Sequence, residues 1–183
     1  MLYIMRHGCT DWNVLHRLQG RTDIPLNAKG RRMAGEAAKR YGEIPLDLCF
    51  SSPLVRARET AEIVLRGRGI PILTDDRLRE MSFGDYEGTE YSFDTAEGPI
   101  NVIFTHPEQY TSSAGGAETF DELFARTGEF LREVINPLMA QGKDVLIVGH
   151  GAMNLSIIGR IRNIPLKDFW TPGIESCRMI RLL

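Results

Sequence analysis

The stretch Met1-Leu2-Tyr3-Ile4-Met5-Arg6-His7-Gly8 decides the fold, because an apolar run of strand-forming residues stands directly before polar, reactive ones. A short apolar run that stops in this way is typical of a buried strand. Residues 144–148 repeat the pattern and lead into Gly149-His150-Gly151. Ligands of open parallel sheets bind at the carboxyl ends of the strands. We therefore predict a buried sheet with reactive residues at its strand ends.

Helical patterns alternate with further strand-like runs. Asn27 can cap one helix, and Ser51-Ser52-Pro53 predicts a second helix with a serine N-cap followed by proline. Thr119-Phe120-Asp121-Glu122 has the form of a capping box, and the helix it starts should end or kink at Asn136-Pro137. Further strands are expected at residues 46–50, 71–74 and 177–182. The alternation predicts an α/β fold, a three-layer sandwich with a mostly parallel central sheet and helices on both faces.

Length and composition indicate one soluble globular domain that spans residues 1–183. The chain has 43% hydrophobic and 25% charged residues, which excludes disordered and fibrous classes. Its formal net charge is -2 and its pI about 6.1, so no general positive field attracts nucleic acid or anionic lipid. We expect no nucleic-acid or membrane partner, and any anion site must be local. The sequence sets no oligomeric state.

The cysteines and the apolar runs indicate the compartment. Cys9, Cys49 and Cys177 are odd in number and far apart, which fits neither a disulfide framework nor a zinc knuckle. No apolar run approaches the roughly 18 residues of a membrane span, and the chain opens on a strand rather than a secretory signal. We expect a cytoplasmic protein.

Residues 88–117 form the one long segment without clear periodicity. The segment carries Tyr91, Phe93, Phe104 and Tyr110. Loops of this length are usually functional or disordered, and the aromatic residues favour a partly ordered lid. Simple packing of these side chains against the sheet is an equally good interpretation.

Four basic side chains should converge at the strand ends. Arg6 and His7 follow the first strand, Arg56 lies on the helix after the second, and His150 follows the strand at 144–148. Such a set repels itself unless an anion lies among its members, and arginine forks match phosphate oxygens. Neighbouring cations should also lower the histidine pKa and keep a ring nitrogen free to attack phosphorus.

Each of these residues has a plainer interpretation. A histidine at a strand end is most often an ordinary satisfied polar residue, and Arg56 could pair with Glu59 on the helix surface. Histidines also bind metals, but no HxH or HExxH spacing is present. We expect neither a metal nor a cofactor.

Four blocks of the chain resemble the histidine phosphatase superfamily, the phosphoglycerate mutase-like enzymes. The first is Arg6-His7-Gly8-Cys9-Thr10-Asp11-Trp12-Asn13, followed by Arg17-Leu18-Gln19-Gly20-Arg21-Thr22-Asp23-Ile24-Pro25-Leu26-Asn27. The second is Ser51-Ser52-Pro53-Leu54-Val55-Arg56-Ala57-Arg58-Glu59-Thr60-Ala61. The third is Leu78-Arg79-Glu80 with Gly84-Asp85-Tyr86-Glu87-Gly88, and the fourth is Gly149-His150-Gly151. The blocks follow the family's order over most of the chain.

The resemblance implies a role for each matched residue. His7 would attack the phosphoryl group and become phosphohistidine, while Arg6, Arg56 and His150 hold its oxygens. Glu80 would protonate the leaving oxygen and then activate water. The substrate-binding set would be Thr10, Asn13, Gln19, Gly20 and the Gly151 amide.

Two positions depart from the family pattern. Cys9 stands where the family usually has another polar residue, so either a thiol lies near the pocket, open to oxidation, or a small side chain fills space. Gly149 replaces the serine that often precedes the second histidine.

Hydrolysis of a small phosphorylated metabolite is the main functional hypothesis. The family's mutases tend to be longer and carry Glu-Arg-His-Tyr in the third block, where this chain has Glu80-Met81-Ser82-Phe83. A cofactor-dependent phosphoglycerate mutase is the first alternative. A phospho-ligand binding protein without turnover is the second, although such a protein would be expected to have lost His7 or Glu80.

Overall fold

The computed structural model describes residues 1–91, 100–111 and 114–183. Within these residues one five-stranded sheet has the order β3-β2-β4-β1-β5. The strands are β1 (Leu2–Arg6), β2 (Leu48–Ser51), β3 (Ile72–Thr74), β4 (Val145–Gly149) and β5 (Met179–Arg181). All neighbouring strands run parallel except β5, which pairs antiparallel with β1. The predicted, mostly parallel sheet is confirmed.

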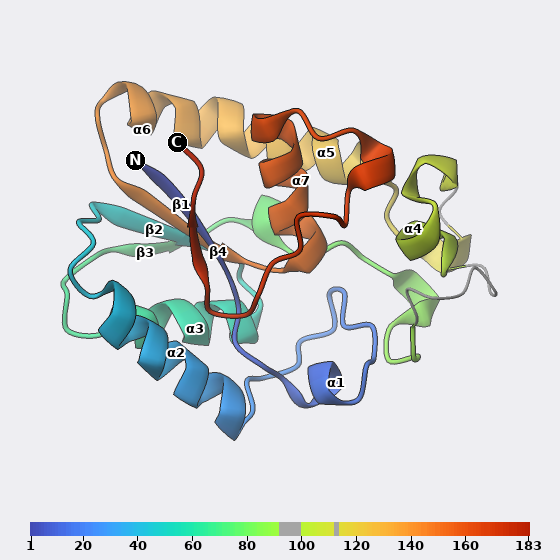
Figure 1. Cartoon of the computed structure of the whole chain (residues 1–183), viewed down its shortest axis with the longest axis horizontal. Coiled ribbons are helices and arrows are strands. Elements are labelled where there is room, and N and C mark those ends of the chain that lie inside the picture. Colours follow the sequence, from blue (N-terminus) through green and yellow to red (C-terminus); the bar gives the residue numbers. More distant parts are fainter. Residues whose placement is uncertain (92–99, 112–113) are drawn as a thin grey trace.

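Helices cover both faces of the sheet (Figure 1). The α-helices of the described residues are α1 (Asp11–Val14), α2 (Ala28–Tyr41), α3 (Val55–Val64), α4 (Val102–Thr105), α5 (Phe120–Phe130), α6 (Asn136–Ala140) and α7 (Gly151–Arg162). The pair α2 and α3 lies on one face, and α5, α6 and α7 lie on the other. The arrangement is the three-layer sandwich expected from the sequence. None of the described helices is long and apolar enough to cross a lipid bilayer.

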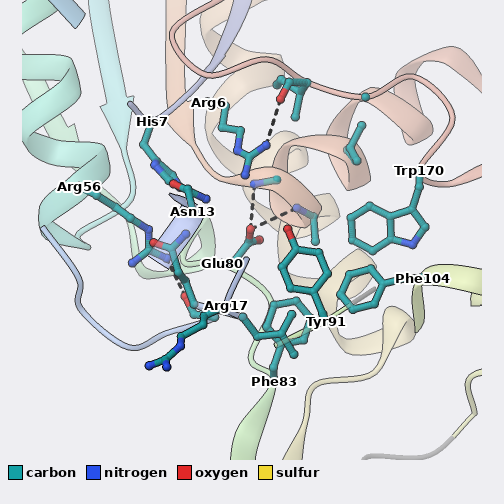
Figure 2. Close-up of a pocket in the computed structure, with 18 residues that line it drawn as sticks. Arg6, His7, Asn13, Arg17, Arg56, Glu80, Phe83, Tyr91, Phe104 and Trp170 are labelled. Carbon is teal, nitrogen blue, oxygen red and sulfur yellow. Dashed lines mark hydrogen bonds between the residues drawn. The ribbon is translucent and has the colours of Figure 1, made fainter. Parts of the chain in front are cut away.

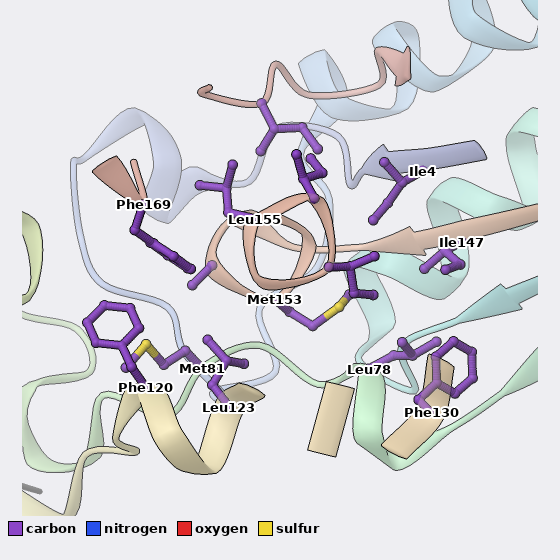
Figure 3. Close-up of a cluster of buried hydrophobic side chains, with 14 of the residues drawn as sticks. Ile4, Leu78, Met81, Phe120, Leu123, Phe130, Ile147, Met153, Leu155 and Phe169 are labelled. Atoms are coloured by element: carbon purple, nitrogen blue, oxygen red, sulfur yellow. The ribbon is translucent and has the colours of Figure 1, made fainter. Parts of the chain in front are cut away.

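The strands have two apolar faces because successive side chains point to opposite sides of a sheet. Ile4 and Ile147 belong to a cluster that includes α5 and α7, whereas Met5 and Val148 join the alanines of α2 and α3. Figure 3 shows the first cluster around α7, whose Met153 packs among large side chains from several elements. Two cores therefore hold the strand ends in place.

Local signals set most helix starts as predicted. Asn27 caps α2 by accepting a hydrogen bond from the Gly30 amide at 2.9 Å. Thr119 and Glu122 form the reciprocal capping box of α5. The distortion expected at Asn136-Pro137 is a π-helical turn at Leu131–Ile135, after which α6 begins with proline in its first turn. The backbone stays helical through this point, so the wider π-helical turn lies just before the proline, whose nitrogen has no hydrogen to donate.

The predicted serine cap of the second long helix is wrong. The helix α3 begins at Val55, and the Val55 amide donates to the Asp23 carboxylate at 2.7 Å. Ser52 instead accepts from the Leu54 amide at 3.3 Å. A carboxylate at a helix N-terminus satisfies a free amide and suits the helix dipole. Here a distant loop supplies the cap, which links that loop to α3.

Candidate active site

The register of β1 and β4 brings two predicted site residues together. Arg6 pairs with Gly149, so the next residues, His7 and His150, leave the sheet side by side. Their rings form an edge contact with centroids 5.2 Å apart. Both side chains are buried, with His7 only 2% exposed.

A cavity of about 200 Å³ opens at these strand ends. Figure 2 shows that its two ends differ in character. Arg6, His7, Asn13 and Arg56 line one end, and the aromatic side chains of Phe83, Tyr91, Phe104 and Trp170 line the other. Glu80 lies between the two ends. The cavity therefore suits a ligand with an anionic head and a less polar body.

His7 has the protonation state of a nucleophile. Its Nδ1 lies 2.7 Å from the Gly8 carbonyl oxygen, which can only accept, so Nδ1 carries the proton and Nε2 keeps its lone pair. Burial lowers the pKa of His7 well below its usual value, and the charges of Arg56 and Arg6 lower it further. The sequence predicted the effect of the cations, but burial is the larger cause.

His150 lies against His7 and does not line the cavity wall. Within the described part of the chain, neither of its ring nitrogens has a hydrogen-bond partner. Burial lowers the pKa of His150 well below its usual value, and the charges of Arg56 and Arg6 lower it further. The structure thus brings His150 to the site as a neutral ring, and its contact with phosphate stays a prediction.

The two buried histidines predict an acid-sensitive fold. Below pH 6.5 the unfolded chain binds protons that the folded chain excludes, so the free energy of unfolding should fall as pH decreases. Each histidine contributes up to about 1.4 kcal/mol per pH unit until its folded pKa is reached. Urea unfolding between pH 5.5 and 7 measures the slope. His150→Gln should reduce it, and a slope equal to wild type would contradict this. His106→Asn, at an exposed position, is the control.

Arg56 and Arg6 supply the positive charge of the site. Arg56 is fully buried, and its Nη1 and Nη2 donate to the carbonyls of Thr22 and Gly20 at 2.9 and 2.7 Å. Burial lowers its pKa to about 10, which leaves it charged at neutral pH. Arg6 donates to the Ile174 carbonyl at 3.2 Å. The Nε atoms of both arginines are buried and lack partners among the described residues.

Glu80 lies at the N-terminus of α7 and accepts four backbone hydrogen bonds. One oxygen accepts from the amides of Gly151 and Ala152 at 2.8 and 3.2 Å, and the other accepts from those of Met81 and Met153, both at 2.9 Å. The free amides of a helix N-terminus favour an anion. The Gly151 amide, predicted to bind phosphate, is therefore bound to Glu80 in this structure.

The other predicted binding residues divide into two groups. Asn13, Gln19 and Gly20 line the cavity, whereas Thr10 is buried outside its wall. The Thr10 hydroxyl donates to Gln19 Oε1 at 2.8 Å and accepts from the Asn13 amide at 3.2 Å. Thr10 thus orients two lining residues, and its own contact with substrate stays a prediction.

Gly20 needs to be glycine. Its φ is +50°, and a Cβ there would lie 2.0 Å from the Glu87 carboxylate. That carboxylate accepts from the backbone amides of Arg21 and Thr22 at 2.9 and 2.8 Å. It therefore fixes the loop whose carbonyls bind Arg56. Glu87 belongs to the third family-like block, and its contacts explain its presence there.

Cys9 fits the space-filling interpretation. The thiol is 9% exposed, donates to the Thr10 carbonyl at 3.5 Å and does not line the cavity. A Cβ on Gly30 would lie 2.1 Å from the Cys9 carbonyl oxygen, so α2 packs directly against this loop.

Sequence reasoning did not predict eight of the lining residues: Arg17, Leu18, Phe83, Ala152, Leu155, Trp170, Gly173 and Ile174. Trp170 is far along the chain from the other lining aromatic residues, and its Nε1 donates to the carbonyl of Ile103 in α4 at 2.7 Å. Tyr91 and Phe104 of the 88–117 segment do line the cavity, while Phe93 lies outside the described residues. Lid movement stays a prediction.

The donor set does not resemble a metal centre. In residues 1–91, 100–111 and 114–183, no three histidine, cysteine, aspartate or glutamate side chains gather closely enough to hold an ion. The residues of the site are instead suited to an oxyanion, because guanidinium and imidazole groups donate hydrogen bonds.

Known proteins share this chain's sequence pattern. A model of the histidine phosphatase superfamily (branch 1) matches residues 2–183. An uncharacterized phosphatase, PhoE of Bacillus subtilis (strain 168), is 34% identical over 97% of this chain and 82% of its own length. A probable phosphoglycerate mutase, GpmB of Serratia proteamaculans (strain 568), is 30% identical over 99% of this chain and 83% of its own.

Solved structures share the fold. Bacillus stearothermophilus YhfR is 36% identical with a TM-score of 0.84, over 97% of this chain and 88% of its own. A mycobacterial glucosyl-3-phosphoglycerate phosphatase, solved with VO3, is 26% identical with a TM-score of 0.79, over 97% and 90%. With a family match across the sequence and a site built from the family-like blocks, the chain belongs to the histidine phosphatase superfamily.

Proposed function

We propose that this protein is a phosphomonoesterase that hydrolyses small phosphorylated metabolites through a phosphohistidine on His7. The observation that carries the proposal is the state of His7, a neutral ring whose Nδ1 donates to Gly8 and whose Nε2 is free beside two arginines. A buried imidazole held in one tautomer is a prepared nucleophile.

Two balanced steps complete the reaction. In the first, Nε2 forms a bond to phosphorus while the ester P–O bond breaks. Glu80, which takes up a proton from solvent when the negatively charged phosphate binds beside it, gives that proton to the leaving oxygen. In the second, Glu80 takes a proton from water as that water attacks the phosphohistidine, which releases phosphate and restores neutral His7. Arg6 and Arg56 stabilise the charge on the phosphoryl oxygens in both steps. The position of Glu80 between the two ends of the cavity supports this role, because an ester oxygen joins the phosphoryl head of a substrate to its body (Figure 2).

The cavity favours hydrolysis over mutase chemistry. Apart from Arg6 and Arg56, the one cationic side chain on the described wall is Arg17. A mutase must bind a carboxylate beside the phosphate, whereas this wall is mostly apolar and aromatic. We infer that the preferred leaving groups carry apolar surface. Three buried free cysteines support the cytoplasm as the compartment.

Phosphate release from a panel of phosphomonoesters, with a chelator present, tests the proposal. We expect turnover that survives chelation, with phenyl phosphate preferred over 3-phosphoglycerate. Loss of activity on chelation would overturn the metal-independent mechanism. Interconversion of 3- and 2-phosphoglycerate faster than phosphate release would establish the mutase. Phosphate-analogue binding without turnover of any ester would favour the binding-only alternative.

A further inference from the structure

Arg126 of α5 holds the loop that carries Glu80 by hydrogen bonds to the loop backbone. Its Nη1 donates to the carbonyls of Arg77 and Arg79 at 2.6 and 2.8 Å, and its Nη2 reaches the Glu80 carbonyl at 3.2 Å. Three carbonyls within four residues thus converge on one guanidinium. The side chain is only 15% exposed, so water competes weakly for these bonds.

Glu118 fixes the orientation of that guanidinium. Its carboxylate, 7% exposed, accepts from Arg126 Nε at 2.6 Å and Nη2 at 2.9 Å, a bidentate pair. The same carboxylate accepts from the Ser82 amide at 3.2 Å, on the other side of Glu80 in the chain. Arg21 adds a second guanidinium, with Nη2 on Glu118 and Nε 3.4 Å from the Glu80 carbonyl. The backbone is therefore held on both sides of Glu80.

Glu80 is held at both its backbone and its side chain. Its carboxylate is bound by amides at the start of α7, while its own carbonyl is bound by Arg126. The helices α5 and α7 are joined beside this point, since Ser156 donates to the Thr127 hydroxyl at 3.0 Å. A small shift of the backbone would move the carboxyl group away from the leaving oxygen, and misplacement by 1 Å can cost about 10²-fold in rate.

We propose that Arg126, oriented by Glu118, is a positioning residue for proton transfer by Glu80. The inference rests on the proposed function, because it gives Arg126 a role only where Glu80 acts as general acid. Arg126 does not line the cavity and touches no substrate. It acts through the backbone of residues 77–82, and its removal should weaken acid catalysis and leave nucleophilic attack by His7 intact.

Dependence on the leaving group separates this role from a merely structural one. Formation of phosphohistidine from the aryl ester of an acidic phenol needs little protonation of the leaving oxygen, whereas an alkyl ester needs it strongly. We expect Arg126→Met to lower kcat/KM about 10²-fold for an alkyl phosphate and only a few-fold for p-nitrophenyl phosphate. Glu80→Gln should show the same selectivity with an equal or larger loss.

A double variant makes the test stricter. If Arg126 acts through Glu80, the pair Glu80→Gln and Arg126→Met should lose little more alkyl-ester activity than Glu80→Gln alone. Arg160→Met is a matched control. Arg160 of α7 also donates to a backbone carbonyl, that of Phe124 in α5, but this bond lies outside the loop that carries Glu80. It should match wild type on both esters. Arg126→Lys, which keeps the charge opposite Glu118, serves if the methionine variant does not fold.

The outcomes distinguish the two proposals. Equal losses on both esters, or additive losses in the double variant, would overturn the positioning role while leaving the phosphatase in place. A wild-type protein without ester hydrolysis, or a Glu80→Gln variant that treats both esters alike, would overturn the general-acid function and this inference with it. Thermal unfolding of each variant, followed by circular dichroism, shows that the kinetic losses belong to folded protein.

Discussion

Replacement of His7 by alanine is expected to lower phosphate release on the order of 10⁴-fold or more, because the variant lacks the only atom proposed to bond to phosphorus. The fold should survive, since His7 lies beyond the end of β1 and a smaller side chain faces the cavity. Steady-state kinetics on the best ester of the panel measures the loss.

Trapping the intermediate checks the same prediction independently. Wild-type protein mixed with a labelled ester and quenched with base should carry an acid-labile phosphoryl group on His7. His16→Ala is the control, since His16 does not line the cavity, and it should keep both label and turnover. Substantial turnover by the His7→Ala variant would sink the covalent mechanism.

Arg56→Lys is expected to reduce kcat/KM by about 10² to 10³-fold, the usual cost of removing a donor aimed at developing charge. Lysine keeps the charge, but its donors all lie on one nitrogen and cannot reproduce the planar fork whose Nη1 and Nη2 bond the carbonyls of Thr22 and Gly20. The unpaired carbonyls should also lower the free energy of unfolding by about 1–3 kcal/mol. Ester kinetics and urea unfolding measure the two effects.

Arg58→Lys is the matched control for this substitution. Arg58 lies on the same helix, is half exposed and pairs only with the exposed Glu62 at 3.7 Å. Exposed pairs of this kind contribute little to stability, so the control should behave as wild type. Equal behaviour of the two lysine variants would show that burial of Arg56 has no functional consequence.

The sheet and the residues at its strand ends were predictable because short apolar runs with polar ends leave few alternatives. The runs before His7 and His150 both became parallel strands, as expected, and the capping box at Thr119 formed. The last strand was expected at 177–182 and is shorter, Met179–Arg181, since Cys177 takes a positive φ of 59° that a strand does not accommodate.

Contacts between distant segments were the part that sequence patterns could not supply. Glu80 bonds amides that lie 71 or more residues away, and nothing near it in the chain signals this. Arg126 resembles any polar residue on an amphipathic helix until its three carbonyl partners are seen. The family resemblance pointed to Glu80, but it gave no hint of Arg126, Trp170 or the cap that Asp23 provides.

The pairing of β1 with β4 also has a consequence for how the protein becomes active. Leu2 of β1 pairs with Val145 of β4. During synthesis the strand that precedes His7 is therefore made first, but its partner strand β4 begins only at Val145, when most of the chain exists. Contacts so distant in sequence form slowly, because a long loop must close before they yield any stabilisation. Recovery of activity during refolding should therefore trail the formation of the helices. The return of catalytic activity would then mark the pairing of β1 with β4, the last step of folding.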